Sequence, residues 1–163
     1  NIMAKPQRIS TCLWFNDKGE EAANFYVSLI PNSRIVHVSR YGAGGRMAEG
    51  LAMLTRFELD GVSFAALNGG PMFPLSEAVS LVVLCDTQME LDRLWNALIA
   101  DGGAESMCGW CKDLFGLSWQ IIPSQLSEWM TSSNTEGMGR LWDKLMGMKK
   151  IDIAALEAAF RGA

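Results

Sequence analysis

The spacing of hydrophobic residues predicts the same succession of elements twice along the chain. An apolar, strand-like run at residues 9–15 precedes a segment whose apolar residues recur three and four positions apart, as on one helix face. We expect Asp17 to cap this helix and Pro31 to end it. The residues of its apolar face are Ala22, Phe25, Tyr26, Leu29 and Ile30.

The second half repeats this plan after a new apolar run at residues 79–85. Thr87 and Glu90 have the three-residue spacing of a capping box, which predicts the start of a helix, and Gly102-Gly103 predicts its end. The apolar face of this helix is Leu91, Leu94, Trp95, Leu98 and Ile99.

Each helix is followed by three segments with the composition of β-strands, so each half has the order strand, helix and three strands. Asp60-Gly61 predicts a tight hairpin turn between two of them. The predicted strands are residues 34–41, 51–59 and 62–68 in the first half, and 104–110, 111–115 and 117–123 in the second.

The chain length favours one domain, residues 7–163, with internal duplication. Module one spans 7–70 and module two 76–124, and the turn-forming residues between Asn68 and Ser76 link them. Residues 125–163 form a helical tail, with helices expected at 136–146 and 152–160. We expect this tail to pack on the sheet or on a second subunit.

Charge argues against two classes of partner. The net charge is −4, and no Lys/Arg cluster is larger than Lys149-Lys150, so we expect neither nucleic acid nor a membrane surface to bind. No apolar run approaches the ~20 residues that span a bilayer, and residues 1–6 lack the apolar segment of a signal peptide. We therefore expect a cytoplasmic protein.

The Cys108–Cys111 segment has two interpretations, a Cys-x-x-Cys redox or metal pair, or part of a β-hairpin beside a pocket. Strand-like sequence surrounds it, so no helix start is available to stabilise a thiolate, and the chain has no second Cys pair for zinc. We favour the hairpin, with Cys108 alone as a pocket thiol. Cys12 and Cys85 lie in apolar runs and are expected to be buried.

Motifs across nearly the whole chain resemble the PhnB-like branch of the vicinal oxygen chelate superfamily, which includes glyoxalases and bleomycin- or fosfomycin-resistance proteins. The resemblance implies an α+β fold in which two βαβββ modules form a cupped mixed sheet, and it implies a homodimer. The residues that carry it are Leu13-Trp14-Phe15, Glu20-Glu21-Ala22, Phe25-Tyr26, Phe57-Glu58-Leu59-Asp60-Gly61, Ala66-Leu67-Asn68-Gly69-Gly70-Pro71, Cys108-Gly109-Trp110, Ser118-Trp119-Gln120-Ile121-Ile122-Pro123 and Lys149-Lys150-Ile151-Asp152.

Members of that branch are often labelled demethylubiquinone methyltransferase-like. A methyltransferase that uses S-adenosylmethionine normally has a Gly-rich turn between a parallel strand and a helix. Gly42-Ala43-Gly44-Gly45 is the candidate here, but a strand-like segment follows it. We therefore interpret it as a hairpin connection and expect no such cofactor, while methyl transfer remains an alternative function.

Metal-dependent members of the superfamily hold a divalent ion with His, Gln or Glu from the first and last strands of each module. The matching positions fall near Ser10 or Thr11, near Ser80, near Ala66 or Asn68, and at Gln120. Only Gln120 has the expected donor type, so we predict no metal. His37, the sole histidine, is interpreted as a packed or edge residue, with a general base facing the pocket as the alternative.

If Gln120 faces the cup, strand alternation directs Trp119 and Ile121 towards the helices and leaves Ile122 beside Gln120. An apolar cup with few polar contacts suits a small organic molecule. We therefore expect a small-molecule-binding protein, or an enzyme that does not use the superfamily metal, with a metal-dependent glyoxalase- or dioxygenase-type enzyme as an alternative. The predicted ligand-binding residues are Trp14, Asn68, Cys108, Trp110 and Gln120; Trp14 alternatively packs on the first helix, and Asn68 alternatively forms a turn.

Overall fold

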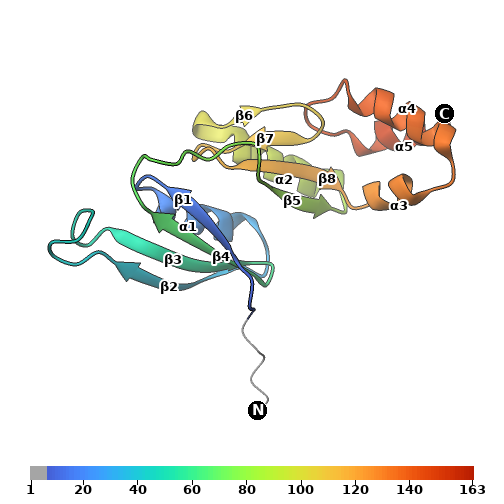
Figure 1. Cartoon of the computed structure of the whole chain (residues 1–163). Helices are drawn as coiled ribbons and strands as arrows, with labels where there is room; N and C mark the ends of the chain where they lie inside the picture. Colours follow the sequence, from blue (N-terminus) through green and yellow to red (C-terminus); the bar gives the residue numbers. More distant parts are fainter. Residues whose placement is uncertain (1–6) are drawn as a thin grey trace, which may run out of the picture. The chain divides into compact units, whose positions relative to one another are not determined.

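Each half of the chain folds into a four-stranded mixed sheet with a helix against one face (Figure 1). A computed structural model describes residues 7–163. Packing divides the chain into two compact units between Leu75 and Ser76, within the predicted linker. The predicted α+β class and the repeated order of elements are confirmed.

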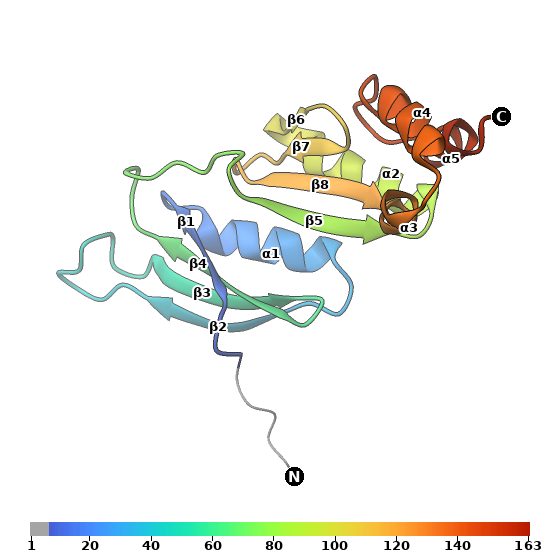
Figure 2. The ribbon, with the colours of Figure 1, turned by 45° about the vertical axis from the view of Figure 1, so that its right-hand side comes forward.

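The first sheet has the strand order β1-β4-β3-β2, in which β1 runs parallel to β4 and the other neighbours are antiparallel. Helix α1 lies along one face of this sheet (Figure 2). Its buried Tyr26 packs near Phe57, which stacks on Phe64 with ring centroids 5.4 Å apart. The elements are β1 (Thr11–Phe15), α1 (Gly19–Leu29), β2 (Arg34–Arg40), β3 (Ala52–Leu59) and β4 (Val62–Asn68).

The second sheet repeats this topology with the order β5-β8-β7-β6, and β5 is parallel to β8. Helix α2 buries Leu94 and Trp95 on its sheet-facing side, while β8 buries Trp119 and Ile121. The elements are β5 (Ser80–Cys85), α2 (Gln88–Ile99), the short 3-10 turn η1 (Ala100–Gly102), β6 (Ala104–Glu105), β7 (Trp110–Lys112) and β8 (Ser118–Pro123).

The C-terminal helices belong to the second unit and are tied to it by hydrogen bonds. They are α3 (Leu126–Thr131), α4 (Thr135–Leu145) and α5 (Ile153–Arg161), of which α4 and α5 pack together. Gln88 of α2 donates to the Ile151 carbonyl and accepts from the Ile153 amide. The tail is therefore held to α2 by hydrogen bonds, and its packing on the sheet or on a second subunit stays a prediction.

The start of α2 follows its sequence signal, but its end and the start of α1 do not: α2 ends at Ile99, before the η1 turn that reaches Gly102. Thr87 accepts a hydrogen bond from the Glu90 amide at 3.2 Å, as the capping box predicts. The prediction that Asp17 caps α1 is wrong, because the N-cap residue is Lys18 and it makes no side-chain capping bond.

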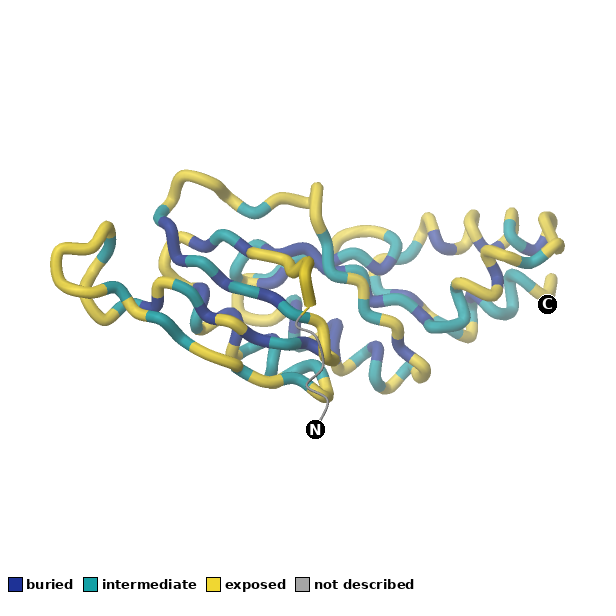
Figure 3. Tube along the Cα trace, turned by 60° about the horizontal axis from the view of Figure 1, so that its bottom comes forward, coloured by how far each residue is buried: buried dark blue, intermediate teal, exposed yellow. Residues whose placement is uncertain are grey.

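Exposed residues gather in two connections, the loop after β2 at residues 42–50 and the linker at 71–79 (Figure 3). None of the helices in residues 7–163 combines the length and the apolar character that a membrane crossing requires. The signal-peptide expectation concerned residues 1–6, which lie outside the described residues.

Candidate functional site

Each sheet has one face packed against its helix and a second face turned away from it, which we call the open face. Along β1, Leu13 and Phe15 are buried on the helix side, so Cys12 and Trp14 lie on the open face. The residues of the other strands that lie on the open face follow from the strand register, because directly paired residues share a face. Trp14 pairs with Leu67, and Leu67 pairs with Leu54.

A groove of about 570 Å³ lies on the open face of the first sheet. Its apolar lining includes Val36, Leu54 and Ala65, one residue from each of three adjacent strands. Its polar lining is Arg34, Arg56 and Glu58 together with Gln7, Ser10 and Ser63.

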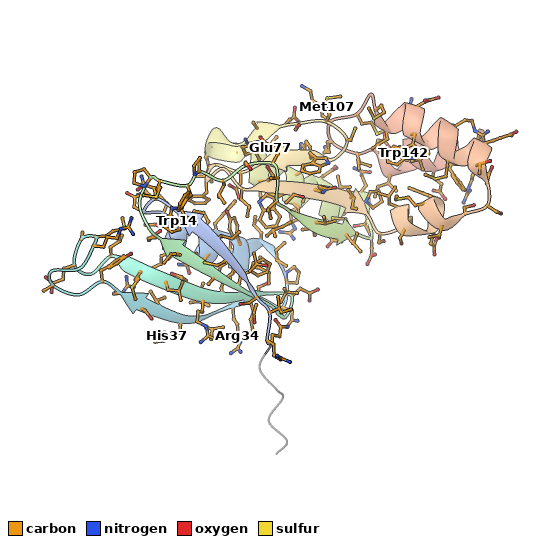
Figure 4. All side chains as sticks on the ribbon, in the orientation of Figure 1. Trp14, Arg34, His37, Glu77, Met107 and Trp142 are labelled. Atoms are coloured by element: carbon orange, nitrogen blue, oxygen red, sulfur yellow. The ribbon has the colours of Figure 1, made fainter. Side chains whose placement is uncertain are left out.

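The charged residues of this groove follow one another along two paired strands. Arg34 of β2 pairs with Glu58 of β3, and His37 of β2 pairs with Arg56. Figure 4 shows the side chains of Arg34 and His37 on β2. His37 is exposed next to Arg56 on the open face, but it does not line the groove.

Arg34 and Glu58 form a two-point ion pair. Arg34 Nε lies 2.7 Å from Glu58 Oε2, and Arg34 Nη2 lies 3.4 Å from Oε1. The hydrogen bond from Arg34 lowers the pKa of Glu58, and Arg56 contributes a smaller effect in the same direction. Glu58 is therefore ionised at neutral pH and neutralises one of the two arginines.

The open face of the second sheet combines apolar residues with the polar Ser80, Ser118 and Gln120 and with Lys112, which pairs with Glu77. Gln120 Nε2 donates to Ser80 Oγ at 2.9 Å. Trp110 and Val82 pair directly with Gln120, so they share its face. Val82 is 52% exposed, whereas Trp119 and Ile121 are 1% and 0% exposed on the opposite face. The predicted alternation along β8 is confirmed.

Trp14 lies on the open face of the first sheet, on the side opposite α1, and packs on the linker. Its Nε1 donates to the Gly70 carbonyl at 2.9 Å, and its ring meets Phe73 edge to face at 4.9 Å. A β-carbon at Gly69 would overlap the Trp14 ring, so the glycine permits this close contact. The alternative in which Trp14 packs on the first helix is wrong.

Asn68 ends β4 on the helix face and is 1% exposed. Its Oδ1 accepts from the Gly19 amide at 2.8 Å, and its Nδ2 donates to the Ala52 carbonyl at 2.9 Å. The Oδ1 end of the amide therefore joins β4 to α1, and the Nδ2 end joins β4 to β3. This arrangement favours the structural alternative, and we leave Asn68 out of the ligand-binding set proposed below.

The two cysteines of the Cys-x-x-Cys segment face different surroundings. Cys108 is half-buried in the turn between β6 and β7, and its Sγ lies 3.7 Å from Met146 Sδ. Cys111 pairs with Trp119 on the helix face, and burial raises the pKa of its thiol to about 12. Both are free thiols, which favours the hairpin interpretation over a redox pair.

The remaining two cysteines give one confirmed and one wrong prediction. Cys85 is buried, and burial is the main cause that raises the pKa of its thiol to about 12. Cys12 is exposed, contrary to the expectation, because it alternates with buried Leu13 and faces the open side of β1.

These environments predict selective alkylation. In native protein treated with iodoacetamide at pH 8, we expect Cys12 and Cys108 to be modified and Cys85 and Cys111 to be protected. Peptide mass spectrometry after a timed quench measures the extent at each site, and denatured protein should be modified at all four. Rapid native modification of Cys111 would contradict the structure.

The positions that match the superfamily's metal ligands do not form a ligand set here. Ser80 and Gln120 meet, but they are uncharged and bond to each other. Ala66 and Asn68 face the helix side of the first sheet rather than the open face. Within residues 7–163 no three His, Cys, Asp or Glu side chains are grouped so that they could hold a metal ion.

The glycine-rich segment Gly42–Gly45 lies in the exposed connection between β2 and β3, which are antiparallel. Tyr41 exchanges backbone hydrogen bonds of 2.9 Å with Leu51 and Gly50 across the base of this loop. The segment therefore connects two strands of a hairpin and does not form the strand-to-helix turn that holds S-adenosylmethionine in parallel sheets.

The charged groove on the first sheet was not predicted from the sequence. A signal was present, because Arg56 and Glu58 are two residues apart in a largely apolar strand and therefore share a face. The residues of β2 that pair with Arg56 and Glu58 could not be predicted from the sequence. The reason is an irregularity in β2 between Ile35 and His37, which shifts its register.

Comparison with known proteins identifies relatives of this chain. Residues 7–122 match the family model described as 3-demethylubiquinone-9 3-methyltransferase. No curated protein matches the chain. A solved structure described as a 3-demethylubiquinone-9 3-methyltransferase, PhnB protein, from Bacillus cereus is 36% identical, with a TM-score of 0.66; the match covers 71% of this chain and 99% of that one.

Two more distant structures share the fold. A protein from Pseudomonas aeruginosa is 23% identical with a TM-score of 0.58, and the match covers 72% of this chain and 97% of that one. The fosfomycin resistance protein FosX from Listeria monocytogenes, solved with Mn(II) and sulfate ion, is 14% identical with a TM-score of 0.52; coverage is 79% of this chain and 100% of that one.

Proposed function

This chain belongs to the 3-demethylubiquinone-9 3-methyltransferase family, as a PhnB-like member of the vicinal oxygen chelate superfamily, and on that premise we propose that it binds a small organic molecule. The groove on the open face of the first sheet is the observation that carries this proposal. Its volume of about 570 Å³ falls within the range of ligand sites, roughly 300–1,000 Å³. It also combines apolar side chains with a few polar groups, as such sites do.

The second sheet supplies a further surface with the same character. Trp110 offers an aromatic wall, and the Gln120–Ser80 pair offers a carboxamide oxygen and a hydroxyl for orienting a ligand. We include Trp14, Trp110 and Gln120 in the proposed ligand-binding set, because all three lie on open faces. Cys108 remains a proposed pocket thiol at the adjoining turn.

We propose that binding does not use the superfamily's usual metal. Alanine and serine at the matching positions provide no imidazole or carboxylate, and the carboxamide of Gln120 alone binds a divalent ion weakly. Elemental analysis of protein purified without chelators tests this. Stoichiometric Fe, Mn, Ni or Zn would favour the alternative, a metal-dependent glyoxalase- or dioxygenase-type enzyme.

The family description makes methyl transfer the second candidate function. The Gly42–Gly45 hairpin gives it no support, because the strand-to-helix turn for the cofactor is missing from that segment. Isothermal titration with S-adenosylmethionine is the direct test. We further propose a cytoplasmic homodimer built from one duplicated domain, for which light scattering gives the mass in solution.

Filling the groove tests its role in binding. Ala65 lies on the groove floor between Cys12 and Arg56 in the sheet register. We expect Ala65→Trp to occupy the groove and to weaken small-molecule binding about tenfold or more, as measured by amide chemical shifts in a fragment screen. Met89→Trp on the exposed side of α2 is the control and should leave the shifts unchanged. Equal binding by both variants would exclude the groove as the binding site.

A further inference from the structure

We propose that the ligand of this groove is a small carboxylate and that Arg56 binds its two oxygens. This inference rests on the proposed function, because it names the chemical class of the molecule bound in the same groove. It follows from how charge is distributed among the groove residues.

The groove carries one positive charge that its own residues do not neutralise. Arg34 and Arg56 contribute two positive charges and Glu58 one negative charge, which leaves a net charge of +1. The Arg34–Glu58 ion pair accounts for one arginine. Within residues 7–163, Arg56 makes neither a side-chain hydrogen bond nor a salt bridge.

The surroundings leave the Arg56 guanidinium available from the groove. Its direct neighbour on β4 is Ala65, whose methyl group is too short to cover the arginine side chain. Its neighbour on β2 is His37, which is exposed. Arg56 lines the groove together with the apolar residues Ala65, Leu54 and Val36.

The number of free donors selects a carboxylate over a phosphate. A guanidinium is planar, and its paired N–H groups match the two oxygens of a carboxylate. A dianionic phosphate has two negative charges shared by three terminal oxygens, which this groove meets with one unpaired cation and the hydroxyls of Ser10 and Ser63. A monoanion of small size, with an apolar body over Leu54 and Val36, fits both the charge and the floor.

The net charge of the whole chain is opposite in sign to that of the groove. The chain carries a net charge of −4, so its overall field repels anions. A local excess of positive charge on an open sheet face is then the feature that would favour an anion there. Since Arg56 is exposed, we expect its contribution to fall as salt screens it.

Benzoate and benzamide are the probes that test this inference, because they share shape and differ in charge. We expect benzoate to shift the amides of Leu54 and Ala65 with an affinity about tenfold higher than that of benzamide. Arg56→Gln should remove this difference. Arg46→Gln, in the exposed loop after β2, changes the net charge equally and should preserve it.

A second variant separates ligand binding from a purely structural role. Glu58→Gln removes the partner of Arg34 and raises the net charge of the groove to +2, so benzoate should bind several-fold more tightly. Loss of structure would not produce this gain. Weaker benzoate binding in folded Glu58→Gln protein would contradict the inference.

The outcomes distinguish two hypotheses: that the ligand is a carboxylate, and that the groove binds small molecules at all. If benzamide binds the groove as tightly as benzoate, the inference that the ligand is a carboxylate is wrong, but the proposal that the groove binds a small molecule is not affected. If only uncharged fragments bind there, the same conclusion follows. If neither probe nor any fragment shifts the groove amides, both the carboxylate and the proposed binding of a small molecule in this groove are wrong.

Discussion

Replacing Asp113 by alanine is expected to destabilise the second unit by about 3–5 kcal/mol, because three hydrogen-bond donors would lose a buried acceptor. Asp113 is 2% exposed in the turn between β7 and β8. Its Oδ1 accepts from the amides of Phe115 and Leu117 at 2.9 and 3.1 Å. Its Oδ2 accepts from Trp119 Nε1 at 2.9 Å.

This carboxylate organises the hairpin that carries the open face of the second sheet. The Asp113 amide also donates to the Leu117 carbonyl, and the Gly116 amide donates to the Asp113 carbonyl. The turn thus fixes where β8 begins, and with it the register that places Gln120 beside Ser80. We therefore expect loss of Asp113 to disturb Gln120 as well as to lower stability.

Urea unfolding followed by tryptophan fluorescence measures the effect, since five of the six tryptophans follow residue 76. Asp113→Asn keeps one oxygen and should be intermediate. Asp143→Ala on the exposed side of α4 is the matched control and should change stability by less than about 0.5 kcal/mol. A loss below about 1 kcal/mol for Asp113→Ala would refute this role of the carboxylate.

The sequence allowed most of the architecture to be predicted because its periodicities are strong and occur twice. The apolar face of α2 follows the expected spacing, whereas in α1 the buried side chains are Ala22, Ala23 and Tyr26 rather than the whole expected face. The Asp60-Gly61 turn has positive φ at both residues, 48° and 78°. Glycine and aspartate tolerate that conformation, which is why the dipeptide was informative.

The predicted elements that differ are those whose limits depend on tertiary contacts. Residues 104–110 were expected to form one strand, but the strand stops at Glu105 and a turn follows. Cys108 and Gly109 have positive φ, 59° and 84°, and their amides bond to the carbonyls of Met148 and Lys149. Helix α3 was not predicted, because its six residues are too few for a periodic signal.

The residues of the candidate site could be predicted only where the alternation of side chains along a strand decides which face they occupy. Gln120 and Trp119 alternate within one regular strand, so their faces followed from the sequence. The orientation of Asn68 depends on Gly19 and Ala52, which are 49 and 16 residues away, and no local pattern encodes these bonds. The excess charge at Arg56 likewise depends on the pairing of Arg34 with Glu58 across strands.

Replacing Asn68 by alanine is expected to destabilise the first unit by about 2–4 kcal/mol, because the Gly19 amide and the Ala52 carbonyl would both lose a buried partner. Gly19 begins α1, so its amide is among those that the helix itself cannot satisfy. A β-carbon at Gly19 would lie 2.8 Å from Asn68 Oδ1, so glycine at the start of α1 permits the close contact with the asparagine.

Asn68→Asp tests the two ends of the amide separately. An aspartate keeps an acceptor for the Gly19 amide but directs a second acceptor at the Ala52 carbonyl. Burial and this repulsion should raise the pKa of the new carboxyl in the folded state above that in the unfolded state. The destabilisation is then largest above the folded pKa and decreases as the pH falls through it, since the protonated form can donate to Ala52.

Stability measured by urea unfolding with circular dichroism at pH 5 and pH 8 should therefore show a larger loss at pH 8 for Asn68→Asp. For Asn68→Ala the loss should be nearly independent of pH, since alanine does not titrate. Asn16→Ala and Asn16→Asp, at an exposed position next to β1, are matched controls and should have small effects. If Asn68 serves only to bind a ligand, both Asn68 variants should unfold like the wild type, and the amide would have no structural role.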